Sequence, residues 1–130
     1  MRVATVLIVI LGSGSLLSGC ATSATKYNWG GYESSLYTYY KDPTKEPELM
    51  GSLLSIINSG AAGKTVVGPG IYAEYGYLLL QQGKLNEAVS SFNEEARRWP
   101  ESKVFMDRMI GLATQQTSVA ITQGAQNNAK

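Results

Sequence analysis

Between residues 71 and 100, apolar side chains recur at intervals of three and four positions, which is the spacing of one face of an α-helix. The first series stops before Gly83, a residue suited to the left-handed turn that ends many helices. The second stops at Trp99, because the residue before a proline is driven out of the helical region. The pattern predicts two helices joined by a tight turn. Their apolar positions are Tyr72, Tyr75 and Leu79, followed by Leu85, Ala88, Val89, Phe92 and Ala96.

The same spacing predicts two earlier helices, at about residues 31–41 and 44–58, with Asp42 and Pro43 breaking the chain between them. A glycine-rich connection follows at residues 59–70. We expect its Val66 and Val67 to pack against the helices.

A fifth helix is expected after Pro100, with a polar outer side like that of a capping helix. We expect Phe105, Met109, Leu112 and Ala113 to form its inner face. Further on, the chain is rich in Gln, Asn, Ser, Thr and Gly, so residues 118–130 are expected to be a disordered tail.

Several positions in residues 71–100 resemble a tetratricopeptide repeat: Tyr72, Tyr75, Gly76, Gly83, Ala88, Phe92 and Pro100. Gly76 lies within the apolar face, where its missing side chain lets the second helix approach closely. One position departs from the repeat, which usually has a small residue three after Phe92. This chain has Glu95 there and Ala96 next, so close packing at that point is disturbed or shifted by one residue. The resemblance implies an all-α fold over residues 28–117, a short tetratricopeptide-like array of about two helix hairpins plus a C-terminal capping helix.

Residues 1–19 have the character of a bacterial signal peptide, with a basic start and an apolar run too short to span a membrane. The residues Leu17, Ser18, Gly19 and Cys20 form a lipobox, which predicts cleavage before Cys20 and attachment of lipid to it. Residues 20–27 would then be a lipidated tether. Ala21 follows the cysteine where an aspartate tends to retain proteobacterial lipoproteins in the inner membrane. By this analogy, we expect a protein anchored to the outer membrane of a Gram-negative bacterium and facing the periplasm.

The chain contains no histidine, and Cys20 is its single cysteine. Histidine is the commonest metal ligand and general base, so we expect no metal site, and no disulfide can form once Cys20 carries lipid. Removing the signal peptide removes Arg2, which leaves ten basic and ten acidic residues and a net side-chain charge of zero. This balance argues against a nucleic-acid partner.

Catalysis has few candidate residues in this sequence, namely Glu33, Glu74 and Lys41. They show no distinctive spacing of paired carboxylates, so we expect no enzyme activity and no cofactor. The run from Gly63 to Thr65 looks like the end of a phosphate-binding loop. The required earlier glycine is Asn58, however, and a helix precedes instead of a strand, so we expect no small-molecule substrate.

A second resemblance rests on an aromatic run near the start of the mature chain, Trp29-Gly30-x-Tyr32-Glu33-x-x-Leu36-Tyr37-x-Tyr39-Tyr40-Lys41. With the lipobox before it and the repeat after it, this run resembles a family of small bacterial lipoproteins classed as a domain of unknown function, the 4810 family. The resemblance covers residues 20 to about 112. In that family the gene often lies beside one for a lipoprotein similar to the curli secretion channel.

These features together favour a lipid-anchored adaptor that binds another envelope protein. The alternatives are an accessory subunit of a channel lipoprotein like that of curli secretion, or an activator of a cell-wall synthase. In a tetratricopeptide array the first helix of each hairpin lines the concave side. By that rule, we expect a partner-binding strip of Tyr37, Tyr40, Tyr77 and Leu80. Packing of these tyrosines against the connection or the capping helix is the other possibility.

Replacing Cys20 with serine removes the thiol that the lipobox presents for acylation. We expect Cys20→Ser to carry no acyl label and to leave the outer-membrane fraction when cells are fractionated. A variant that stays in that membrane without a labelled acyl chain would show the anchor prediction to be wrong.

Overall fold

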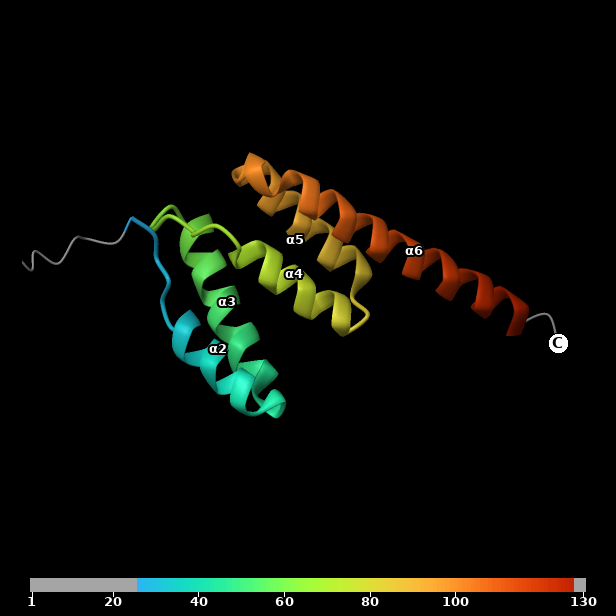
Figure 1. Ribbon diagram of the computed structural model, residues 1–130, viewed down its shortest axis with the longest axis horizontal. Helices are drawn as coiled ribbons and strands as arrows, with labels where there is room; N and C mark the ends of the chain where they lie inside the picture. Colours follow the sequence, from blue (N-terminus) through green and yellow to red (C-terminus); the bar gives the residue numbers. More distant parts are fainter. Residues whose placement is uncertain (1–25, 128–130) are drawn as a thin grey trace, which may run out of the picture.

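The computed structural model describes residues 26–127, and the side chains of this range up to Val119. Five α-helices make up most of it (Figure 1): α2 (Tyr32–Lys41), α3 (Glu46–Ala61), α4 (Ile71–Gln81), α5 (Leu85–Arg98) and α6 (Lys103–Asn127). Short 3-10 turns at Pro43–Lys45 and Pro100–Ser102 precede α3 and α6. No strand occurs in the described range, which confirms the predicted all-α class. None of these helices is both long and apolar enough to cross a membrane.

The helices pack in consecutive pairs, α2 on α3, α3 on α4, α4 on α5 and α5 on α6. The chain therefore forms two hairpins, α2–α3 and α4–α5, with α6 laid along the second one (Figure 1). Two apolar clusters hold this arrangement. One joins α2 and α3 to α4 around Leu49, Leu53 and Ile56. The other joins α4 to α5 and α6 around Leu79, Phe92 and Met106.

The α4–α5 hairpin follows the sequence prediction closely. Gly83 has a φ of +73°, and the amide of Lys84 donates to the Leu79 carbonyl at 2.9 Å, the bond that closes a Schellman turn. At Gly76, a Cβ atom would lie 2.7 Å from Phe92 Cε1 and 3.1 Å from Ser91 Cβ. The missing side chain therefore allows α5 to approach α4, as the sequence indicated.

The connection between the hairpins is fastened to the segment before α2. The Asn28 amide donates to the Val66 carbonyl at 3.0 Å, and the Trp29 ring lies against Gly68, where a Cβ would be 2.8 Å from the ring. Val67 is buried, as expected, but Val66 is 54% exposed, so its predicted packing is wrong. The backbone is extended where Asn28 and Val67 form an isolated β-bridge. The side chains of Val66 and Val67 therefore point to opposite sides, and only Val67 reaches the core.

Glu95, the departure from the repeat pattern, is buried in the structure with 1% of its surface exposed. Its Oε1 accepts the Gly70 amide at 2.7 Å and lies 3.5 Å from the Ser102 hydroxyl. Gly70 is the N-cap residue immediately before α4, and Ser102 immediately precedes α6. The carboxylate thus links the starts of two helices from within a third, while Ala96 beside it is partly buried against the second cluster.

The inner face of α6 differs from the predicted one. Met109 and Ala113 are buried as expected, but Phe105 and Leu112 are 60% and 50% exposed. Met106 is the residue that packs into the second cluster, one position along from Phe105. The outer side of α6 therefore carries apolar side chains and is less polar than the sequence suggested.

The predicted tail at residues 118–130 differs over residues 118–127, because α6 continues to Asn127, and residues 128–130 lie outside the described residues. The hydroxyls of Thr117 and Ser118 each donate to the carbonyl four residues earlier, at 3.0 Å, within the helix. Such bonds satisfy Ser and Thr side chains without interrupting the backbone ladder. Because glutamine is a good helix former and no proline follows, the polar composition does not end the helix here.

Gly76→Leu should force the α4–α5 contact apart, since even a Cβ at this position overlaps the Phe92 ring. We expect the free energy of unfolding to fall by about 1–3 kcal/mol, measured by chemical denaturation followed by circular dichroism. Gly51→Leu in α3 is the matched control, because nothing lies within 4 Å of its Cβ position. That change should be neutral or stabilise by about 0.5–1 kcal/mol, from improved helix propensity. Equal effects at both glycines would contradict the packing argument.

Candidate functional site

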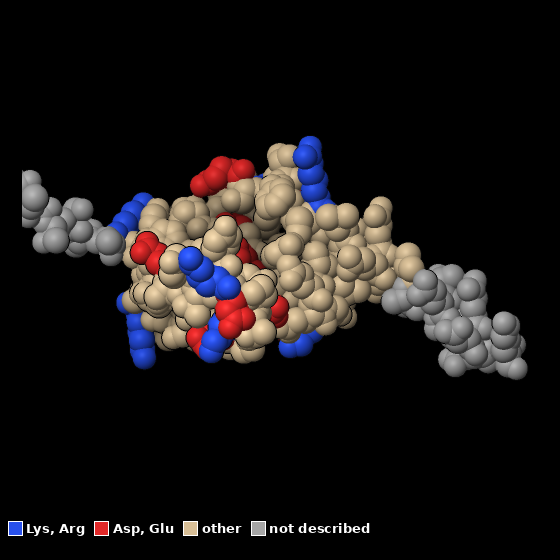
Figure 2. All heavy atoms as spheres, turned by 60° about the horizontal axis from the view of Figure 1, so that its bottom comes forward, with Lys and Arg blue, Asp and Glu red and all other residues tan. Residues whose placement is uncertain are grey.

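A hollow of about 310 Å³ opens between α2, α4 and α6. We call it the inner groove. Its lining residues are Tyr32, Gly70, Ala73, Glu74, Tyr77, Phe92, Phe105, Met106 and Met109. In Figure 2, some red acidic atoms are set back between tan side chains. Glu74 is the one charged residue in the lining, so the groove is a largely apolar hollow.

The α4 helix supplies the central wall of the inner groove. Most of its circumference is covered, since Ile71, Tyr72 and Leu78 belong to the first cluster and Leu79 to the second. The stripe left over carries Ala73, Glu74 and Tyr77, which recur at the spacing of one helix face. The sequence leaves a single face of α4 free, and that face turns to the groove.

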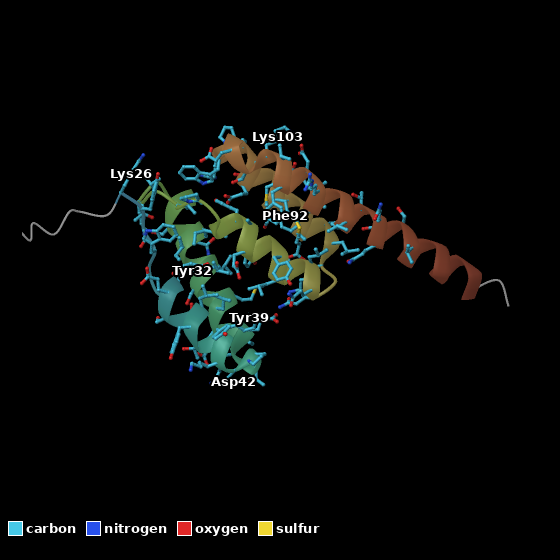
Figure 3. The ribbon with its side chains drawn as sticks, in the orientation of Figure 1. Lys26, Tyr32, Tyr39, Asp42, Phe92 and Lys103 are labelled. Atoms are coloured by element: carbon cyan, nitrogen blue, oxygen red, sulfur yellow. The ribbon has the colours of Figure 1, made fainter. Side chains whose placement is uncertain are left out.

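The remaining walls come from helices on either side of α4. Tyr32, labelled on α2 in Figure 3, lines one side, while Phe105, Met106 and Met109 of α6 line the other. Phe92 of α5 lies beneath them, fully buried. Because Phe105 is 60% exposed and Tyr77 46% exposed, aromatic surface is available at the rim. Such rings offer large contact area with few rotamers to fix.

Glu74 is half buried in this apolar wall, and within the described residues its carboxylate makes neither an ion pair nor a hydrogen bond. Burial raises the pKa of its carboxyl above the ordinary value. The pKa of Tyr32 is raised as well, first by burial and then by the nearby Glu74 charge. Several other acids in the described range are paired: Glu48 with Lys45, Glu94 with Arg97 and Arg98, and Asp107 with Lys103. Glu74 thus presents an uncompensated carboxylate to the inner groove.

The predicted binding strip is only partly assembled at this site. Tyr77 lines the inner groove, but Tyr37, Tyr40 and Leu80 do not. Tyr37 and Tyr40 are 63% and 81% exposed on α2, and Lys41 Nζ lies 5.4 Å from the Tyr37 ring centre. Leu80 packs against the second cluster instead. Whether these residues bind a partner stays a prediction, and of the four only Tyr77 lines the inner groove.

Sequence reasoning did not predict that Tyr32, Glu74 and Phe105 line a common groove. Glu74 was considered as a catalytic candidate with Glu33 and Lys41, yet neither of those two lines the groove. The signal that could have found Glu74 was its spacing of three from Tyr77, which places both on one face of α4. Phe105 was assigned to the core, and Cys20 lies outside the described residues.

The chemistry available in the groove is apolar contact combined with one carboxylate. Nowhere in residues 26–127 do three or more His, Cys, Asp or Glu side chains gather as they would around a metal ion. The volume is near the lower end of ligand sites, which occupy about 300–1,000 Å³. That space suits one or two inserted side chains.

Glu74→Gln should stabilise the fold at neutral pH, because the raised pKa means that burial penalises the charged carboxylate. A raised folded-state pKa contributes stability that is present below the unfolded pKa and lost as pH rises through the folded pKa. The gain in melting temperature should therefore be seen at pH 7 and vanish near pH 4, below the ordinary glutamate pKa. Glu87→Gln, at an exposed site on α5, is the control and should show no such difference. A Glu74→Gln protein that melts lower at pH 7 would reveal a stabilising partner for the carboxylate.

Comparison with known proteins gives one match. No curated protein and no solved structure has significant similarity to the chain. The profile of the family described as Domain of unknown function (DUF4810) matches residues 26–109, which is more than half of the sequence. The match spans α2 to α5 and ends in α6 at Met109, a residue of the inner groove. The chain therefore belongs to the DUF4810 family.

Proposed function

We propose that this protein is an outer-membrane lipoprotein whose tetratricopeptide-like helical domain faces the periplasm and binds another envelope protein. In this proposal the lipid on Cys20 holds the chain at the membrane, and the partner occupies the inner groove. The observation that carries the proposal is the groove itself, an apolar hollow between helices with exposed aromatic residues at its rim.

Two features of the groove support binding of a protein segment. Phe105 and Tyr77 expose large apolar surfaces, which on a soluble domain mark contact sites when they gather in one place. The hollow is also built on helices held by two packed clusters, so it exists before any partner arrives. A preformed site loses less conformational entropy when it binds.

The groove supports binding better than catalysis. Glu74 is its one carboxylate, and no lysine, arginine or second acid stands beside it in the lining. General acid–base chemistry needs a donor and an acceptor positioned around the reacting atoms. Binding of a protein segment, by contrast, needs only apolar contact and a single charged group, and the groove provides both.

Site-specific cross-linking in living cells tests the proposal with the full chain. A photoactivatable aromatic residue replaces Tyr77 in one strain and Asn86, an exposed residue of α5, in another. We expect one protein adduct from position 77 and none from position 86, because only the former lines the groove. Equal labelling at both positions, or no adduct at position 77, would sink the proposal.

The same experiment decides between the candidate partners. Mass spectrometry of the adduct would show a cell-wall synthase if the protein is an activator, and a channel lipoprotein if it is an accessory subunit. Placing the cross-linker at Tyr37 and Tyr40 tests the wider strip that the sequence predicted. Adducts from these sites with the same partner would extend the binding surface along α2.

A further inference from the structure

We propose that the inner groove takes a lysine or arginine side chain from an apolar stretch of the partner, with its charge on the Glu74 carboxylate and its stem against Tyr77 and Phe105. This inference rests on the proposed function, because it requires that a protein segment occupies the groove. It adds the chemistry by which that segment is selected.

The uncompensated carboxylate is the first argument for a cation. Glu74 lines an apolar hollow and has no cationic neighbour among the described residues, whereas Glu48, Glu94 and Asp107 are paired. An acid placed in apolar surroundings without a partner weakens the fold. A bound cation would remove that penalty by pairing with the carboxylate. The binding free energy of a cationic segment would therefore be more favourable than that of a neutral one.

The aromatic side chains around Glu74 are the second argument. Tyr32 of α2, Tyr77 of α4 and Phe105 of α6 line the same hollow. Aromatic faces attract lysine and arginine head groups through the ring quadrupole, and the long aliphatic stems of these residues pack on apolar surface. A carboxylate surrounded by rings and methionines matches both ends of such a side chain.

The charge also decides against the opposite class of partner. An acidic segment would bring a like charge beside Glu74, where the low polarity of the walls strengthens repulsion. A purely apolar segment would fill the hollow but leave the carboxylate covered and unpaired. A basic residue flanked by apolar ones satisfies both surfaces of the groove.

The test keeps the photoactivatable residue at position 77 in the full chain and adds a second change at Glu74. Glu74→Gln has the same shape without the charge, and we expect it to lower adduct yield about tenfold, which corresponds to about 1.4 kcal/mol. Glu87→Gln on α5 is the control and should leave the yield unchanged, since this residue lies outside the groove. Glu74→Gln is expected to fold at least as stably as the parent protein, so a lower yield would not come from unfolding.

The partner peptide in the adduct supplies the second measurement. It should carry a lysine or arginine within about one helical turn of the cross-linked residue. Exchanging that residue for glutamate should abolish the adduct, and combining the exchange with Glu74→Lys should restore it. A position-77 adduct whose yield ignores Glu74→Gln, or whose peptide has no nearby base, overturns this inference and leaves the proposed function standing. No position-77 adduct in the parent chain removes both.

Discussion

The close contact between Gly76 of α4 and Phe92 of α5 is the constraint on which the other features depend. Phe92 is fully buried there, and the same ring forms the floor of the inner groove. Because α5 sits directly on α4, it also fixes where α6 lies, since α6 packs on α5. The position of the α6 wall relative to α4 thus depends on a glycine that does not itself line the groove.

Glu95 adds a polar tie to this apolar contact. Its Oε1 accepts the Gly70 amide, at the point where the chain enters α4, and lies near Ser102, before α6 begins. A buried carboxylate that accepts a backbone amide makes a stronger bond than a neutral acceptor would. Glu95 of α5 therefore holds the starts of α4 and α6 in position relative to α5. The repeat pattern has only a small residue at this position.

The extent to which the sequence predicted this fold varies with the kind of signal. The spacing of apolar residues predicted α2 to α5 within a few residues, and Gly76 and Gly83 act as their local chemistry indicated. It placed the inner face of α6 one residue off, because Phe105 is as apolar as Met106. The sequence alone does not show which of the two residues packs against α5, and in the structure Met106 is the buried one. Polar composition suggested a tail where side-chain hydroxyls bond within a continuing helix. Among the candidate site residues, Tyr77 was found from repeat geometry. The role of Glu74 depends on how α2, α4 and α6 meet, which no local pattern encodes.

The bond between the Asn28 amide and the Val66 carbonyl has a mechanical consequence. Any pull on the chain from the N-terminal side of Lys26 reaches this bond, and the Trp29 ring against Gly68, before it reaches α2. The force is then shared between the α2–α3 hairpin and the connection that leads from α3 to α4. A pull from this end therefore loads the Asn28–Val66 bond and the Trp29–Gly68 contact before it loads the helices that form the inner groove.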